Sequence, residues 1–191
     1  MALGYVRPAR EEDVDEIARI QLSTWRTAYT DVVPAAVLRE LTMEYLAEGW
    51  RDACAQPPRS AHQVFVAVEQ SEDDRADVRC VGFAAVGPEA EDEADLPADA
   101  ADDQVGAVVE LLVEPRFARR GHGSRLLSAS VAHWREHGLA VARAWVFVRD
   151  SASLDFYKSA GWEADGMRRI LDMAGEEVPQ LRLHADVTDP A

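Results

Sequence analysis

The chain has 191 residues, of which 48% are hydrophobic, and this size and composition suit one large domain with a full core. Its formal net charge of −15 at pH 7 disfavours nucleic acid and anionic membranes as partners, because both would repel it at long range. No apolar run approaches the ~20 residues that cross a bilayer. We recognise no signal peptide, and Cys54 and Cys80 suggest neither a disulfide framework nor a metal site, so we expect a cytoplasmic protein without a membrane partner.

The first third of the chain predicts a short strand followed by three helices. Residues 5–7 are the candidate strand, and the acidic run 11–13 suits the positive end of a following helix. Pro34 is expected to start the second helix, and residues 42–54 form the third. Helical spacing predicts a buried face on the first helix, carrying Val14, Ile17, Ala18, Trp25 and Ala28.

The middle of the chain changes to β-rich segments. Residues 64–68 and 80–86 are two strands of an expected hairpin, and the polar segment 71–77 is its turn. Residues 108–113 predict a further strand, which Pro115 ends.

Segment 89–103 carries eight acidic residues and no basic one. Such a composition is typical of a solvated, mobile loop. The charge could steer a cationic amine toward the protein, but solubility explains it more simply.

The second half alternates helices and strands. Residues 121–137 predict a helix, 141–148 a strand and 151–160 a short helix. Residues 167–173 and 180–187 are the final strands. A strand–helix–strand unit at the centre of the sequence favours a single α+β domain.

An anion site is predicted where the strand 108–113 leads into the next helix. Gly121 and Gly123 open that helix, and its first backbone N–H groups have no partners within the helix. Arg119 and Arg120 add positive charge just before it. The motif is neither a P-loop nor a dinucleotide fingerprint. Glycines that merely let the helix pack against the sheet are the alternative, and it remains open.

The same segment resembles the acyl-CoA-binding motif of the GNAT superfamily of N-acetyltransferases. Its pattern is Val-x-Pro followed by Arg/Gln-x-x-Gly-x-Gly/Ala, and Val113, Pro115, Gly121 and Gly123 match it in register. The strand 145–148 followed by Asp150, Phe156-Tyr157 and Gly161-Trp162 is similar to the second half of that family. The opening residues 6–9, with Ser23-Thr24-Trp25, resemble one bacterial branch of it.

The resemblance implies one GNAT-like domain over residues 1–191: a mixed, twisted sheet of six to seven strands with about four flanking helices. It implies acetyl-CoA as the cofactor and a primary amine, on a small molecule or a protein, as the acceptor. The pantetheine arm would lie between two parallel strands that splay apart, those ending at Val113 and Val148. Family members are commonly dimers, so a homodimer stays open.

Eleven residues correspond to the family's cofactor site. Three of them depart from its pattern: Ala118 replaces Arg or Gln, Asp150 replaces Asn, and Ser153 replaces Ala. His122 is expected to face solvent as a spacer between the glycines. The full set is Leu112, Val113, Ala118, Arg119, Arg120, Gly121, His122, Gly123, Ser124, Asp150 and Ser153.

Two residues are the candidate catalytic groups. Tyr157 matches the family's general acid, which would protonate the departing thiolate. Glu110 is the candidate base for the attacking amine, and a strand-end carboxylate facing solvent is the equal alternative. Trp25 and Tyr29 are expected to line the acceptor pocket, although Trp25 could equally be core packing.

Two rival functions stay open at this stage. A non-catalytic acyl-CoA sensor would keep the cofactor site without turnover. Residues 133–137 also fit H-x-x-E-H, the inverted zinc peptidase motif. We expect no metal there, because this helix begins with the phosphate motif and its last turn should be exposed.

Overall fold

The computed structural model describes residues 3–55, 57, 60–70, 78–89 and 105–188. The predicted turn 71–77 and all of the acidic segment except Glu89 lie outside these residues. No helix within the described ranges is long and apolar enough to span a membrane.

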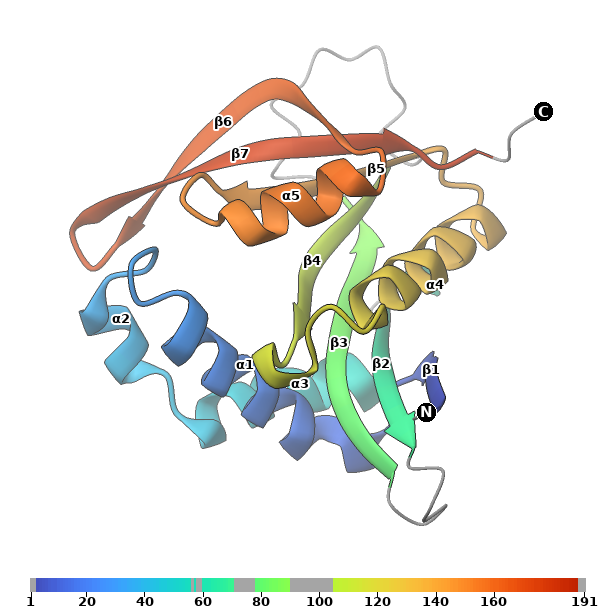
Figure 1. Cartoon of the computed structure of the whole chain (residues 1–191), viewed down its shortest axis with the longest axis horizontal. Helices are drawn as coiled ribbons and strands as arrows, with labels where there is room; N and C mark the ends of the chain where they lie inside the picture. The colour runs from blue at the N-terminus through green and yellow to red at the C-terminus, as the bar shows by residue number, and fades with distance from the viewer. Residues whose placement is uncertain (1–2, 56, 58–59, 71–77, 90–104, 189–191) are drawn as a thin grey trace.

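Within the described residues, seven strands form one mixed sheet in the order β1-β2-β3-β4-β5-β7-β6 (Figure 1). Only β4 and β5 are parallel, and every other neighbouring pair is antiparallel. The strands are β1 Leu3–Pro8, β2 Gln63–Gln70, β3 Val78–Pro88, β4 Val105–Val113, β5 Val141–Phe147, β6 Glu163–Met173 and β7 Glu176–Asp186.

In the part of the chain that the structure describes, five α-helices cover the two faces of the sheet. Their bounds are α1 Val14–Ala28, α2 Ala35–Glu40, α3 Met43–Ala55, α4 His122–Glu136 and α5 Ser151–Ser159. Two short 3-10 turns, η1 Glu11–Asp13 and η4 Pro115–Phe117, precede α1 and α4. The α+β architecture expected from the sequence, a mixed sheet of six to seven strands with flanking helices, is confirmed among the described residues, and each predicted helical segment corresponds to one of these helices.

Each face of the sheet carries its own hydrophobic core. Helices α4 and α5 cover one core, in which Leu126 and Trp134 are fully buried. Helices α1 and α2 cover the other, where Ile17 and Ile20 meet Phe83 of β3. The sheet therefore holds side chains from α1 and from α5 on opposite sides of the same central strands.

The strand boundaries differ from the predicted ones for identifiable reasons. β4 begins at Val105 rather than 108, and its Gly106 makes room for a core side chain: a Cβ there would lie 2.7 Å from the Trp134 indole nitrogen. β6 begins at Glu163 rather than at the predicted residue 167. Gly166, whose φ is +89°, lies at an irregularity in its pairing with β7, and the strand continues on both sides of it. Ala28 is exposed, because the last turn of α1 extends beyond the core.

Candidate active site

The two central parallel strands are paired for only part of their length. Val105–Val108 of β4 pair with Val141–Ala144 of β5, and the register between these two described strands ends there. β4 nevertheless continues to Val113, and β5 continues to Phe147. The splay that the resemblance implied is therefore present as a gap in the middle of the sheet.

The backbone groups that face this gap follow from the register of β4 on β3. The Glu114 N–H donates to the Val81 carbonyl at 2.9 Å, on the side of β4 that faces β3. Successive residues of a strand point alternately to the two sides, so Leu112 also turns its N–H and C=O toward β3. Leu111 and Val113 turn theirs toward the gap.

A β-bulge at Val109 determines where the neighbouring side chains point. Glu110 lies opposite Ala85 and Val108 opposite Val86, so Val109 is the extra residue on β4. Without the bulge Glu110 would share a face with Val108. With it, Glu110 lies on the α1 face of the sheet, within reach of α1 side chains.

A cavity of about 210 Å³ lies where β4 and β5 diverge. Val108–Leu111 and Ala144–Phe147 form its strand walls, and α5 closes it with Tyr157. Side chains from α1, β6 and β7 complete the lining. The cavity contains both residues predicted to be catalytic, together with both predicted acceptor residues, Trp25 and Tyr29.

Glu110 is half-buried and lines this cavity, so its carboxylate faces the cavity rather than open solvent. Burial raises the pKa of Glu110 to about 7, the Asp150 charge also raises it, and the nearby Trp25 and Gln21 donors lower it. The Gln21 amide nitrogen lies 3.5 Å from Glu110 Oε2. A carboxyl group with such a pKa can exchange a proton near neutral pH.

Tyr157 enters the cavity from α5 and is only 5% exposed. Its ring packs against Trp162, with the ring centroids 4.9 Å apart. Burial raises the pKa of Tyr157, and the charges of Glu110 and Asp150 raise it further. The hydroxyl therefore keeps its proton at neutral pH and is available as a donor.

Asp150 caps the N-terminus of α5. Its Oδ1 accepts the Ser153 N–H at 3.0 Å, and its Oδ2 accepts the Ser153 hydroxyl at 2.6 Å. The two departures from the family pattern are thus coupled, because the Ser153 hydroxyl serves the carboxylate that replaces Asn. Asp150 is buried and contributes a second acidic group to the cavity.

Three aromatic rings wall the cavity on its α1 side. Trp25, Tyr29 and Phe147 contact one another edge to face, with centroid distances between 5.6 and 6.4 Å. The buried indole N–H of Trp25 meets no acceptor at full hydrogen-bond geometry in the described part of the chain, but it lies close enough to Glu110 to lower the pKa of that carboxyl. Trp25 therefore both packs against neighbouring aromatic rings and lines the cavity, as the two alternatives for this residue proposed.

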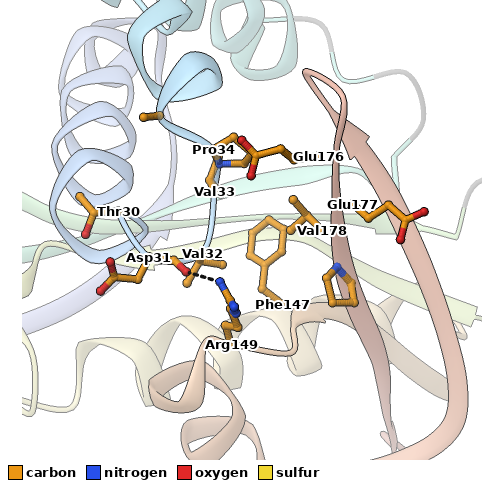
Figure 2. A pocket seen from close by; sticks show the side chains of 12 residues that line it. Thr30, Asp31, Val32, Val33, Pro34, Phe147, Arg149, Glu176, Glu177 and Val178 are labelled. Atoms are coloured by element: carbon orange, nitrogen blue, oxygen red, sulfur yellow. Dashed lines mark hydrogen bonds between the residues drawn. The ribbon is translucent and has the colours of Figure 1, made fainter.

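A larger cavity of about 770 Å³ lies next to the first one. It lies between the connection from α1 to α2, residues 30–34, and the start of β7, residues 176–179 (Figure 2). Phe147 lines both cavities. Figure 2 shows its ring at the centre, with Arg149 beside it donating to the Asp31 carbonyl at 3.2 Å. The two cavities therefore share the Phe147 side chain as part of their walls.

The predicted anion site at the start of α4 has the expected backbone geometry. Gly121 is the N-cap with a φ of +80°, and no side chain caps the helix. The first helical hydrogen bond runs from Arg125 N–H to Gly121 carbonyl at 3.0 Å, so the N–H groups of residues 122–124 come before it. Ala118, in contrast, already donates its N–H to Pro115.

His122 does not face solvent, which corrects the expectation. It is 2% exposed, and its Nε2 lies 2.9 Å from Oε2 of Glu69 on β2. A side chain in the first helical turn points back past the helix start, here toward β1, where Gly4 leaves room for the ring. Glu69 also accepts from Arg120 at 3.0 Å, whereas Arg119 has no partner among the described residues.

Glycine is required at the two positions of the motif for different physical reasons. Gly121 needs its left-handed φ, which other residues adopt only with strain. A Cβ on Gly123 would lie 3.3 Å from the Phe156 ring of α5, so this glycine also lets α4 and α5 approach. Gly123 therefore has a packing role toward α5 rather than toward the sheet, whereas Gly121 has a conformational one.

The histidines of the H-x-x-E-H segment are engaged with the backbone. The Nε2 of His133 lies 3.1 Å from the Ala61 carbonyl, and the Nδ1 of His137 lies 2.8 Å from the His133 carbonyl. No group of three or more metal-ligating side chains occurs among the described residues.

Sequence reasoning missed three residues around the cavity: Gln21, Trp50 and Phe147. Gln21 follows Val14, Ile17 and Ala18 at helical spacing, so a polar residue on the buried face of α1 was a readable signal. Phe147 lies at the end of a predicted strand, which gave no hint of its place between two cavities.

A sequence model of the acetyltransferase (GNAT) family matches residues 22–162 of the chain. The chain therefore belongs to this family. It is 29% identical over 154 residues to YuaI, an uncharacterized N-acetyltransferase of Bacillus subtilis strain 168, and the match covers 81% of the chain and 77% of YuaI.

Solved structures share the fold at low sequence identity. The PaiA N-acetyltransferase of Thermoplasma acidophilum, in complex with coenzyme A, has a TM-score of 0.70 at 14% identity, covering 96% of the chain and 99% of PaiA. YncA of Salmonella typhimurium, with acetyl-CoA, has a TM-score of 0.67 at 17% identity, and the match covers 99% of the chain and 96% of YncA.

The buried carboxyl group predicts a pH-dependent cost in stability. The pKa of Glu110 is about 7 in the folded protein against 4.5 for the free group. Between these values the folded state holds the extra proton, so the free energy of unfolding falls as pH rises. In Glu110→Gln the free energy of unfolding should not fall in this way, because the amide does not ionise. Urea unfolding at pH 8 should therefore show the variant to be more stable than the wild type by roughly 1–3 kcal/mol.

The same comparison at pH 5 should show a much smaller difference. Glu44→Gln, at an exposed carboxylate of α3, serves as the control and should track the wild type at both pH values. A Glu110→Gln advantage that is equal at pH 5 and pH 8 would contradict the burial of an ionised carboxylate.

Proposed function

We propose that the protein is an N-acetyltransferase that transfers the acetyl group of acetyl-CoA to a primary amine by direct attack in a ternary complex. The observation that carries this proposal is the cavity where β4 and β5 diverge. It brings the raised-pKa carboxyl of Glu110 and the protonated hydroxyl of Tyr157 to the edge of an open backbone gap. Membership of the acetyltransferase family supports the same reaction.

The residues around the gap fit a coenzyme A thioester. Leu111 and Val113 offer unpaired backbone groups to an extended pantetheine arm, so the contact expected at Leu112 moves to Leu111. The N–H groups of residues 122–124 fit a pyrophosphate, with Gly121 holding the turn. The complexes of PaiA with coenzyme A and of YncA with acetyl-CoA, which share this fold, support the cofactor.

The side chains near the phosphate site differ in what they can add. Arg119 has a guanidinium without a partner among the described residues, whereas the charge of Arg120 is already shared with Glu69. Ala118 contributes no side-chain donor. Asp150 and Ser153 are bonded to each other, so their role is to fix the start of α5 beside the thioester.

The bound thioester supplies an activated acetyl carbonyl carbon. Glu110 accepts the proton that the acceptor amine must lose before or during attack. The Leu111 N–H can donate to the carbonyl oxygen as negative charge develops on it. Tyr157 donates its phenolic proton to the departing sulfur.

The acceptor would enter through the larger cavity and pass Phe147. Trp25 and Tyr29 then line its final position next to Glu110. The aromatic wall and the two carboxyl groups suit an amine that arrives as a cation, because rings and carboxylates both attract an ammonium group. A screen of primary amines with acetyl-CoA, following thiol release, tests the activity. A protein that binds acetyl-CoA without turning over any amine would instead be a sensor.

The phosphate site predicts a difference between two adjacent arginines. Arg119→Ala should weaken coenzyme A by about 3- to 10-fold, because it removes an unpaired charge beside the anion. Arg120→Ala should cost less, because Glu69 already neutralises this side chain. Calorimetry with coenzyme A measures both losses, and pantetheine, which lacks the phosphates, is the control ligand and should bind both variants alike. A larger loss for Arg120→Ala would contradict the assignment.

Tyr157→Phe tests the proton donor. The variant keeps the ring against Trp162 but lacks the hydroxyl, so kcat should fall by about 10² to 10⁴ while coenzyme A affinity and Tm stay nearly unchanged. Tyr45→Phe, at an exposed tyrosine of α3, is the matched control and should keep its kcat. Wild-type kcat in Tyr157→Phe would reduce this residue to core packing.

A further inference from the structure

Two side chains outside the reacting groups form a hydrogen-bonded chain that leads from Trp50 through Gln21 to Glu110. Gln21 lies on the buried face of α1 and is 9% exposed. Its amide nitrogen lies 3.5 Å from Glu110 Oε2, and its amide oxygen accepts the Trp50 indole N–H at 2.7 Å. A buried amide is costly unless both of its ends are satisfied, so this arrangement calls for a physical explanation.

The Trp50 indole fixes which end of the amide faces Glu110. An indole N–H can only donate, so its partner on Gln21 must be the amide oxygen. The amide NH₂ is thereby turned toward the carboxylate. If the amide flipped, its oxygen would face Glu110 and repel the ionised form.

The position of Trp50 is itself determined by packing. Its ring lies edge to face on Phe83, a fully buried residue of β3, with the centroids 5.0 Å apart. Trp50 and Gln21 also line a separate cavity of about 400 Å³ on the α3 side. Water there could satisfy either end of the amide, so among the described groups only the indole selects the orientation.

The other groups that face Glu110 do not help it to ionise. Asp150 at the start of α5 repels its negative charge, and Tyr29 and Tyr157 are both coupled to it electrostatically. None of the described residues lining the cavity is a lysine or an arginine. The neutral donors from α1, Gln21 and Trp25, are therefore what favours the ionised form.

We propose that Gln21 and Trp50 are positioning residues of the reaction: Trp50 orients the Gln21 amide, and the amide holds Glu110 ionised and aimed into the cavity. Neither residue touches the reacting atoms. The inference rests on the proposed function in one respect, the role of Glu110 as the base.

The direct test is an NMR titration of the Glu110 carboxyl carbon in protein labelled with ¹³C-glutamate, without cofactor or acceptor. Glu110→Gln identifies the resonance. Trp50→Phe keeps a ring on Phe83 but removes the N–H, and Gln21→Met keeps the volume but removes the amide. Each should move the titration midpoint upward by about half to one pH unit.

The double variant should move the midpoint no further than Gln21→Met alone, because Trp50 acts only through the amide. Tyr45→Phe, which alters an aromatic residue of the same α3-side cavity, is the control and should leave the midpoint in place. In the acetyl transfer assay, the acid limb of kcat/KM should move upward with the NMR midpoint.

Midpoints that stay at the wild-type value in both single variants would overturn the proposal and leave the pair a packing role. This result would not affect the proposed function, which is judged by thiol release from the wild type. An acid limb that persists in Glu110→Gln would remove Glu110 as the base, and the positioning role would fall with it.

Discussion

The site depends on one constraint: β4 cannot remain paired with both of its neighbours. β4 stays in register with β3 as far as Val113, and β5 stays in register with β7 as far as Phe147. The bulge at Val109 increases the local twist, and beyond Val108 the two halves of the sheet diverge. Backbone groups left unpaired inside a fold cost free energy, so a ligand that pairs with them recovers part of that cost.

The same bulge links this gap to the chemistry. By shifting the alternation of β4, it turns Glu110 toward α1 while Leu111 keeps its backbone toward the gap. Tyr157 arrives from α5 on the opposite side, where Asp150 holds the start of that helix. Burial raises the pKa of both Tyr157 and Glu110, and no positive charge among the described residues lining the cavity offsets this effect. Because the two pKa values stay far apart, the tyrosine can donate a proton and the carboxylate can accept one near neutral pH.

Local patterns predicted the elements and the phosphate motif, since helical and strand periodicity and the glycine spacing lie within short segments. The residues that sequence reasoning misjudged or left open depend on distant partners. His122 is buried against Glu69, a residue 53 positions earlier in the chain. Glu110 faces the cavity because of a bulge in β4 that no local pattern reveals. The effect of Trp50 on Gln21 is likewise a contact between two helices. Periodicity predicts faces, whereas register and long-range contacts determine which atoms meet.

The central claim is that the gap beside β4 receives the pantetheine arm of coenzyme A, and amide hydrogen exchange measured by NMR tests it most directly. The N–H groups of Leu111 and Val113 face the gap, whereas that of Leu112 faces β3. On addition of coenzyme A, exchange at Leu111 and Val113 should slow strongly, while Leu112, protected beforehand, should change little. Unchanged exchange at Leu111 and Val113 in protein saturated with coenzyme A would contradict the account.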